Sequence, residues 1–192
     1  MTGHTVASAR WRALDCEGDD SCRLCRTDHG WMLVGHARFR AKDTGFSALD
    51  YVVRCDTGWQ TISADIAGMQ EGLEVNLRVV KENDTWLLND VVQLGVNGAT
   101  DLDLSFTPAT NLMPLRRLMA SGEASEITRA AWLRYPRADL QTLDQTYGRT
   151  GHAGTYSYKA KQTGYATRLR ADDIGFVTSY PDLWEGMVTF AD

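Results

Sequence analysis

The sequence predicts a mainly β protein: a large antiparallel sheet curled into an open or incomplete barrel, with one or two short helices. The first observation is a recurring short alternation of apolar and polar residues, closed each time by a turn signal. The second is the presence of 17 glycines and only 4 prolines, which favours many tight turns over stiff linkers. The third is the large number of such segments, because strand twist accumulates across a wide sheet and makes it curl or close.

The first half of the chain contains a regular series of predicted strands. The clearest is residues 73–80, LEVNLRVV, in which apolar residues occupy alternate positions. It follows the glycine pair Gly68 and Gly72 and precedes a polar turn at residues 82–84. Such regular spacing is typical of consecutive antiparallel strands. The strands predicted here are residues 31–40, 46–55, 59–66, 73–80 and 86–92.

The second half continues the same pattern. The strands predicted here are residues 101–106, 127–135, 155–160, 165–171 and 176–180, and residues 172–175 form a hairpin turn. Two of these strands end at Pro136 and Pro181, since proline cannot donate a hydrogen bond to a neighbouring strand. Residues 114–119 are the one predicted helix, because Pro114 occupies the favoured first helical position and Gly122 follows the end.

Composition and net charge limit the classes of function that the chain can have. With 192 residues, 43% hydrophobic and 23% charged, the chain is predicted to form a single domain over residues 1–192. A net charge of −5 argues against nucleic-acid binding, which needs a basic face. The N-terminal segment MTGHTVASARWRALDCEGDD contains no secretory signal, and no apolar run is long enough to span a membrane. We therefore expect a cytoplasmic protein.

The cysteines and histidines do not form a recognisable site in the sequence. In a reducing cytosol we expect free thiols at Cys16, Cys22, Cys25 and Cys55. Cys22 and Cys25 form a CxxC, but no second pair completes a zinc site, and residues 23–24 fit a strand rather than the helix start of a redox motif. No nucleophile motif or phosphate loop is present. The sequence thus predicts no catalytic residue, no metal and no cofactor.

The most informative segment is residues 101–118, DLDLSFTPATNLMPLRRL. On a strand, Asp101 and Asp103 point to one face, while the leucines between and after them point to the other. Arg116 and Arg117 follow on the predicted helix. In one interpretation an Asp–Arg ion pair locks the strand to the helix. In the other, the same polar cluster lines the mouth of a cavity and holds an anionic or hydroxyl-rich head group. Both can hold at once.

This segment resembles the central motif of the bacterial putative glycolipid-binding family, earlier catalogued as a domain of unknown function. The resemblance continues at residues 145–147, 172–177 and 180–181, and so spans most of the chain. The chain departs from the family pattern at Ala109, at Met113, at Gly186 and after Trp59, where no arginine follows closely. The positions that match the central motif are Asp101, Asp103, Thr107, Pro108, Thr110, Asn111, Pro114, Arg116, Arg117 and Leu118.

The resemblance implies an incomplete barrel, like those of lipoprotein carriers, around an apolar cavity. The function expected is therefore binding of a lipid-like or glycolipid-like small molecule, with its polar end held by the cluster described above. The predicted ligand-binding residues are Asp101, Asp103, Thr107, Asn111, Arg116, Arg117, Gln145 and Tyr147.

Two other functions stay open in the sequence. The chain could be an enzyme acting on a sugar or phosphorylated metabolite with Asp101 and Asp103 as acid and base. It could also be an interaction subunit without a small ligand, joined through an edge strand. The aromatic residues, among them Trp132 and Trp184, are expected mainly to pack a barrel core. In the alternative interpretation some of them, such as Tyr156, Tyr158 and Tyr165, line a cavity wall.

Overall fold

The computed structural model describes residues 3–41 and 45–191, and within them the chain forms one sheet of fifteen strands. The strands are β1 (His4–Ala13), β2 (Glu17–Thr27), β3 (Gly30–Ala41), β4 (Gly45–Cys55), β5 (Thr61–Gln70), β6 (Leu73–Glu82), β7 (Thr85–Leu88), β8 (Val91–Val92), β9 (Asp101–Leu104), β10 (Ser125–Leu133), β11 (Leu140–Arg149), β12 (Thr155–Ala160), β13 (Tyr165–Ala171), β14 (Val177–Tyr180) and β15 (Trp184–Phe190). The helix α1 (Leu112–Ser121) and the short 3-10 turns η1 (Leu94–Val96) and η2 (Ala109–Asn111) complete the described elements.

The strand order places the two ends of the chain side by side in the middle of the sheet. The order is β8-β7-β6-β5-β4-β3-β2-β1-β15-β14-β13-β12-β11-β10-β9, with β1 and β15 antiparallel neighbours. The predicted large antiparallel sheet is confirmed, with one exception: β9 and β10 are parallel. The reason is that η2 and α1 return the chain to the end at which β9 began, as a parallel connection requires.

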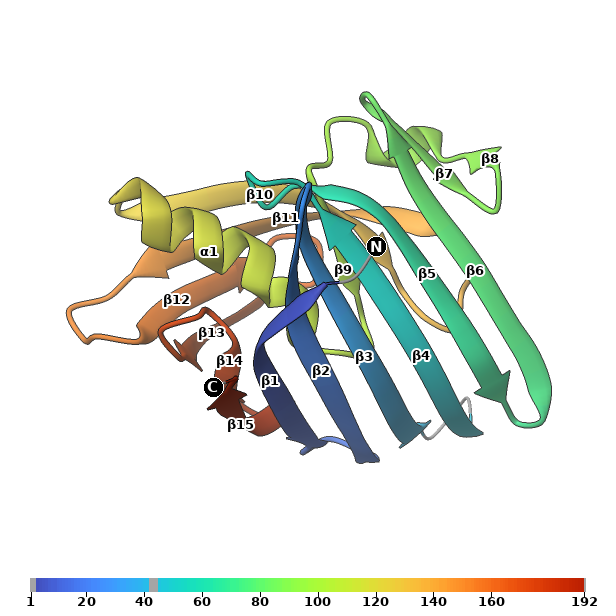
Figure 1. The fold of residues 1–192 in the computed structure, drawn as a ribbon, viewed down its shortest axis with the longest axis horizontal. Coiled ribbons are helices and arrows are strands. Elements are labelled where there is room, and N and C mark those ends of the chain that lie inside the picture. The colour runs from blue at the N-terminus through green and yellow to red at the C-terminus, as the bar shows by residue number, and fades with distance from the viewer. Residues whose placement is uncertain (1–2, 42–44, 192) are drawn as a thin grey trace.

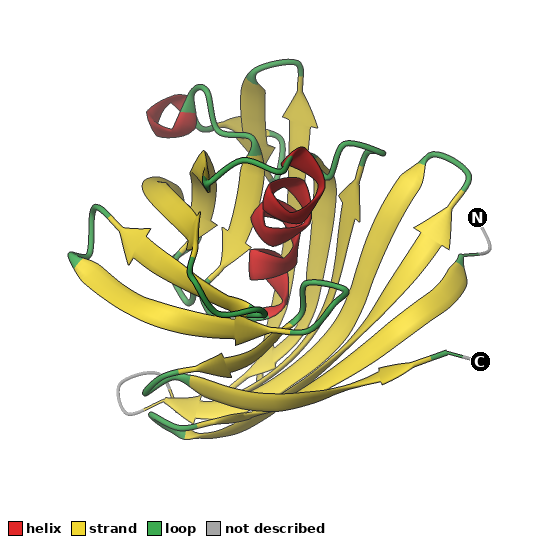
Figure 2. Cartoon of the chain, turned by 90° about the vertical axis from the view of Figure 1, so that its left-hand side faces the viewer, coloured by secondary structure: helices red, strands yellow, loops and turns green. Residues whose placement is uncertain are grey.

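The sheet curls without closing, as predicted. Figure 2 shows the strands wrapped around α1, which lies in the concave side. Isolated hydrogen bonds, rather than a continuous ladder, join the β9 region to distant strands: Thr61 N donates to Thr100 O at 3.1 Å, and the Trp86 indole donates to Ala99 O at 3.1 Å. One cluster of buried apolar residues runs through both halves of the chain.

The helix α1 fills part of the space inside the curl and contacts β10 and β11 (Figure 1). It buries Leu112, Leu115 and Leu118, whose spacing places them on one helical face. It is longer than the predicted residues 114–119 and is preceded directly by η2. It ends at Gly122, whose φ of 72° is the left-handed conformation that glycine adopts without strain.

Some predicted strand boundaries were wrong. The predicted strand 86–92 is interrupted at Asn89 and Asp90, which both have positive φ and form the turn between β7 and β8. Trp59 belongs to the turn before β5, with a φ of 66°. The predictions for β12 and β13 agree with the structure at both ends. Four strands, β1, β2, β11 and β15, were not predicted as complete elements.

Candidate functional site

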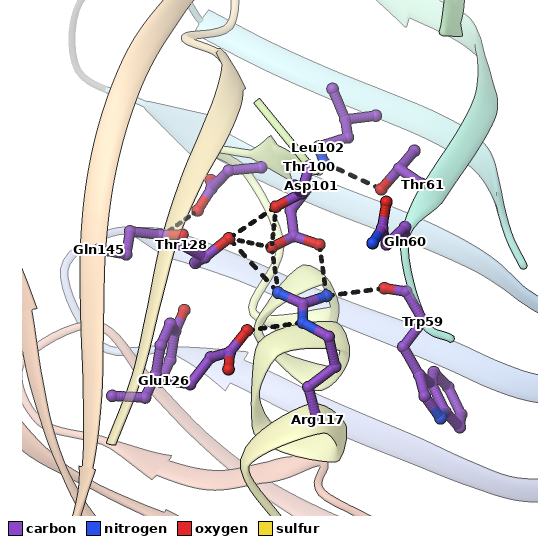
Figure 3. A network of polar contacts seen from close by, with 12 residues as sticks. Trp59, Gln60, Thr61, Thr100, Asp101, Leu102, Arg117, Glu126, Thr128 and Gln145 are labelled. Atoms are coloured by element: carbon purple, nitrogen blue, oxygen red, sulfur yellow. Dashed lines mark hydrogen bonds and ion pairs between the residues drawn. The ribbon is translucent and has the colours of Figure 1, made fainter. Parts of the chain in front are cut away.

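A buried arginine joins three elements of the fold (Figure 3). Arg117 on α1 makes two parallel hydrogen bonds to Asp101 on β9, at 2.8 and 2.6 Å. Its Nε donates to Glu126 at 2.6 Å, and its terminal nitrogens also donate to Trp59 O at 2.9 Å and to the Thr128 hydroxyl at 3.4 Å. All five N–H donors of the guanidinium are therefore used. We call these five residues the clamp.

The clamp is largely buried and contains two ion pairs, Arg117–Asp101 and Arg117–Glu126. The Asp101 side chain is 2% exposed and the Arg117 side chain 17%. Burial alone would lower the pKa of Arg117, but its hydrogen bonds and ion pairs with Asp101 and Glu126 outweigh burial and raise it. The Thr128 hydroxyl donates a further bond to Asp101 at 2.5 Å. The predicted Asp–Arg ion pair between strand and helix is thus Asp101–Arg117, and this guanidinium keeps no donor for a ligand.

The adjacent Arg116 points elsewhere. Its guanidinium carbon lies 5.1 Å from the centre of the Trp59 ring, and its Nη1 donates to Ile174 O at 3.2 Å. Trp59 stacks on Trp31 with ring centres 4.4 Å apart, and Arg26 covers the other side of Trp31. Two arginines therefore enclose two stacked indoles, an arrangement that cation–π attraction stabilises.

A pocket of about 250 Å³ lies beside the clamp, on the face of β9 that carries Asp103. The segment 101–118 contributes a polar side to it through Asp103, Thr107 and Asn111. Aromatic side chains from β12, β13 and β14 line another part of it: Tyr158, Tyr165 and Tyr180. Asp101, Arg116 and Arg117 are not among the described residues that line it.

Asp103 is the charged group of the pocket. Gln145 on β11 donates to Asp103 at 2.9 Å and also to the Tyr158 hydroxyl at 2.9 Å, so the amide bridges the two side chains. Burial raises the pKa of Asp103 to about 6, although the bond from Gln145 acts in the opposite direction. Burial likewise raises the pKa of Tyr158 to about 12, and the nearby Asp103 adds to this shift. The pocket therefore contains one carboxylate and neutral hydroxyl and amide groups.

A second polar pair fixes the start of the helix next to this pocket. The Tyr147 hydroxyl donates to the Asn111 side-chain oxygen at 2.8 Å, and the Asn111 amide donates to Pro108 O at 3.1 Å. The Tyr147 ring also packs against the Tyr158 ring, with centres 5.0 Å apart. These bonds hold Asn111 at the pocket wall, whereas Tyr147 bonds to Asn111 without lining the pocket itself.

A fully buried carboxylate, Asp20, holds the loop before η2. Asp20 on β2 is 1% exposed and accepts hydrogen bonds from the Tyr51 hydroxyl at 2.9 Å and from the Thr107 hydroxyl. Thr107 in turn accepts a bond from Ala109 N at 3.0 Å. Burial raises the pKa of Asp20 to about 7, against the hydrogen bonds from Thr107 and Tyr51, which lower it. Thr107 therefore links the pocket to the opposite strands of the sheet.

A second pocket, of about 270 Å³, adjoins the first. Both are lined by Ser105, Leu183 and Trp184, which form the boundary between them. The second pocket adds Phe39 and Phe106, whose rings stack with centres 6.1 Å apart. The two spaces together reach the size typical of small-molecule sites, about 300–1,000 Å³. Asp103 and the tyrosines lie at one end, and Phe39 and Phe106 lie at the other, together with Asp15.

The structure separates the predicted ligand-binding residues into two groups. Asp103, Thr107 and Asn111 line the first pocket, and Gln145 and Tyr147 hydrogen-bond to Asp103 and Asn111. Asp101 and Arg117 belong to the clamp, and Arg116 to the tryptophan stack. The pocket residue Tyr180 and the buried Asp20 were not predicted as site residues from the sequence. Alternation of apolar and polar residues indicates which face of a strand such a residue occupies. It does not indicate which strands come together at the pocket.

The four cysteines are free thiols, and three of them are buried. In residues 3–41 and 45–191 no group of three or more His, Cys, Asp or Glu side chains is arranged to hold a metal ion. Across the same residues, no helix has the length and apolar character needed to cross a membrane.

Comparison with known proteins agrees with this architecture. A protein of the DUF1089 family from Pseudomonas aeruginosa has a similar crystal structure, with a TM-score of 0.72, 24% identity, and coverage of 86% of this chain and 91% of that one. A β-barrel-like protein of the DUF1849 domain from Brucella abortus is also similar, with a TM-score of 0.57, 11% identity and full coverage of both chains. No curated protein matches the sequence. The sequence profile of the family described as putative glycolipid-binding matches residues 8–186, and the chain therefore belongs to that family.

Proposed function

We propose that this protein binds an amphipathic small molecule of the glycolipid type in the two adjoining pockets. The observation that carries the proposal is their chemical asymmetry. The end at Asp103 and Asn111, where Gln145 hydrogen-bonds to Asp103, continues past Trp184 to the stacked rings of Phe39 and Phe106, beside which Asp15 lies. A ligand with a polar head and an apolar tail matches both ends.

The polar end suits a head group rich in hydroxyls. Asp103 offers lone pairs, and the Asn111 amide and the Tyr158 hydroxyl, which line the same pocket, offer further polar groups. Aromatic rings beside such groups, here Tyr165, provide apolar faces on which a sugar ring can lie. The family description as glycolipid-binding supports the same class of ligand.

The aromatic end suits an aliphatic chain. Each methylene removed from water contributes about 0.8 kcal/mol, so a tail in the Phe39–Phe106 pocket supplies most of the affinity. The clamp contributes indirectly in this proposal: it holds β9 against α1, and so keeps Asp103 and Asn111 in place without touching the ligand.

The geometry favours binding over the enzymatic alternative. A mechanism with Asp101 and Asp103 as acid and base needs both carboxylates at the substrate. Only Asp103 lines the pocket, whereas Asp101 is fully engaged with Arg117 and Thr128.

The test is native mass spectrometry of the protein as purified from bacteria, on the wild type and two variants. Ala160 is buried and lines the first pocket, so Ala160→Phe fills it. Ala166 is exposed on the neighbouring strand, so Ala166→Phe is the matched control. We expect a bound small molecule, or binding of added dodecyl maltoside, in the wild type and in Ala166→Phe, and its loss in Ala160→Phe with the circular dichroism spectrum unchanged. Equal binding by all three proteins, or binding by none, contradicts the proposal.

A further inference from the structure

The pocket contains a negative charge without a matching positive charge. Among the described residues that line it, Asp103 is the one charged side chain, and none is Lys, Arg or His. A carboxylate taken out of water is costly unless it is paired or fully hydrogen-bonded. Among the described residues that line the pocket, none supplies a positive charge to balance Asp103.

Asp103 is half-buried, and it has fewer partners than the two fully buried carboxylates, Asp101 and Asp20. Asp101 is paired with Arg117 through two hydrogen bonds. Asp20 accepts bonds from two hydroxyl groups. Asp103, which lines the pocket, accepts one hydrogen bond at Oδ2 from the neutral amide of Gln145, and among the described residues no donor bonds to its Oδ1.

The aromatic walls of the pocket also favour a positively charged group. Tyr158, Tyr165 and Tyr180 pack against one another with ring centres 5.6 to 6.4 Å apart, and all three line the pocket. The face of an aromatic ring carries negative charge density and attracts ammonium groups, quaternary ones included. A neutral sugar gains from the ring faces and hydroxyls but leaves the Asp103 charge uncompensated. An anionic head group is repelled by it.

We propose that the head group of the ligand carries a positive charge, an amine or a quaternary ammonium, held against Asp103 and the Tyr158–Tyr165–Tyr180 cluster. This inference rests on the proposed function and specifies its ligand. An amino sugar and a trimethylammonium head group share the required alkylammonium chemistry.

The experiment compares amphiphiles that share one tail. Isothermal titration calorimetry below the critical micelle concentration measures dodecyltrimethylammonium, dodecylammonium and dodecyl maltoside against the wild type, Asp103→Asn and Asp84→Asn. Asp103→Asn keeps the shape of the side chain and removes the charge. Asp84 is exposed, and Asp84→Asn removes the same charge from the surface, which controls for the general attraction of cations to a chain of net charge −5.

We expect the better of the two ammonium probes to bind the wild type roughly tenfold or more tightly than the maltoside, as one charge-assisted contact allows. Asp103→Asn abolishes that preference, and Asp84→Asn preserves it. A tighter trimethylammonium points to the ring faces, and a tighter primary ammonium points to hydrogen bonding with Asp103; either order supports the inference. Maltoside binding as tight as that of both ammonium probes overturns it while leaving the proposed function standing. Failure of all three probes to bind overturns both.

Discussion

Removal of Asp101 from the clamp is expected to be far more costly than removal of an exposed carboxylate from an ion pair. Asp101→Ala deletes both bonds to Arg117 and the bond from Thr128, and leaves Arg117 largely buried without its main partner. Breaking a buried ion pair on one side costs about 3–5 kcal/mol. The matched control is Asp65→Ala, because Asp65 pairs with Arg54 at 2.6 Å but has a half-exposed side chain. That loss is worth about 0–1 kcal/mol.

Stability is measured by thermal melting and by urea unfolding, both monitored by tryptophan fluorescence and circular dichroism, with the midpoint and slope of each urea curve fitted. In a chain of this size each kcal/mol shifts the melting temperature by about 2–4 °C, so Asp101→Ala should melt at least ~6 °C below the wild type. The melting temperature of Asp101→Asn should lie between those of Asp101→Ala and the wild type, because the amide keeps one hydrogen-bond acceptor. A midpoint for Asp101→Ala equal to that of Asp65→Ala would refute the structural role of the clamp.

Three further predictions concern the buried groups near the pocket. Gly35→Ala should destabilise the protein by about 1–3 kcal/mol in thermal melting, because its new Cβ would lie 2.1 Å from the Tyr51 ring, whereas Gly151→Ala, with open space around it, should be near neutral. The pKa of Asp20 is raised to about 7, so the folded chain binds this proton more tightly than the unfolded chain; its contribution to stability is fully present below about pH 4 and is lost as pH rises to 7. The stability penalty of Asp20→Asn, measured by urea unfolding, should therefore shrink between pH 4 and pH 8, and a constant penalty would contradict this. Dodecyltrimethylammonium, whose charge does not titrate, should bind more weakly in calorimetry below about pH 6, where Asp103 gains its proton, and a pH-independent affinity would count against a charge contact.

The regularity of the apolar–polar alternation decided whether several of the strands were predictable from the sequence. Residues 155–160 and 165–171 alternate regularly and correspond to β12 and β13. In β2 the inward Asp20 breaks the apolar series, and in β11 the inward Gln145 does the same. These interruptions occur at polar residues that hold the pocket and its loop, so the signal for the strand was weakest where the candidate function is concentrated.

Local spacing also explains which parts of the site were predictable. The segment 101–118 places Asp101 and Arg117 on consecutive elements, so their ion pair follows from a short connection. The sequence does not indicate the parallel pairing of β9 with β10, because it depends on the direction in which η2 and α1 cross the sheet. Tyr180 and Trp184 reach the pocket only through the curl of the whole sheet, which brings β14 and β15 opposite β9.

The most direct test of the proposed binding is a crystal structure of the protein as purified from bacteria or grown with dodecyltrimethylammonium. The two-pocket arrangement predicts elongated density that begins at Asp103 among the tyrosines, passes Trp184, and ends between Phe39 and Phe106. Ordered water alone in both pockets under saturating amphiphile, or amphiphile bound only on the outer face of the sheet, would contradict the proposed binding in the two pockets.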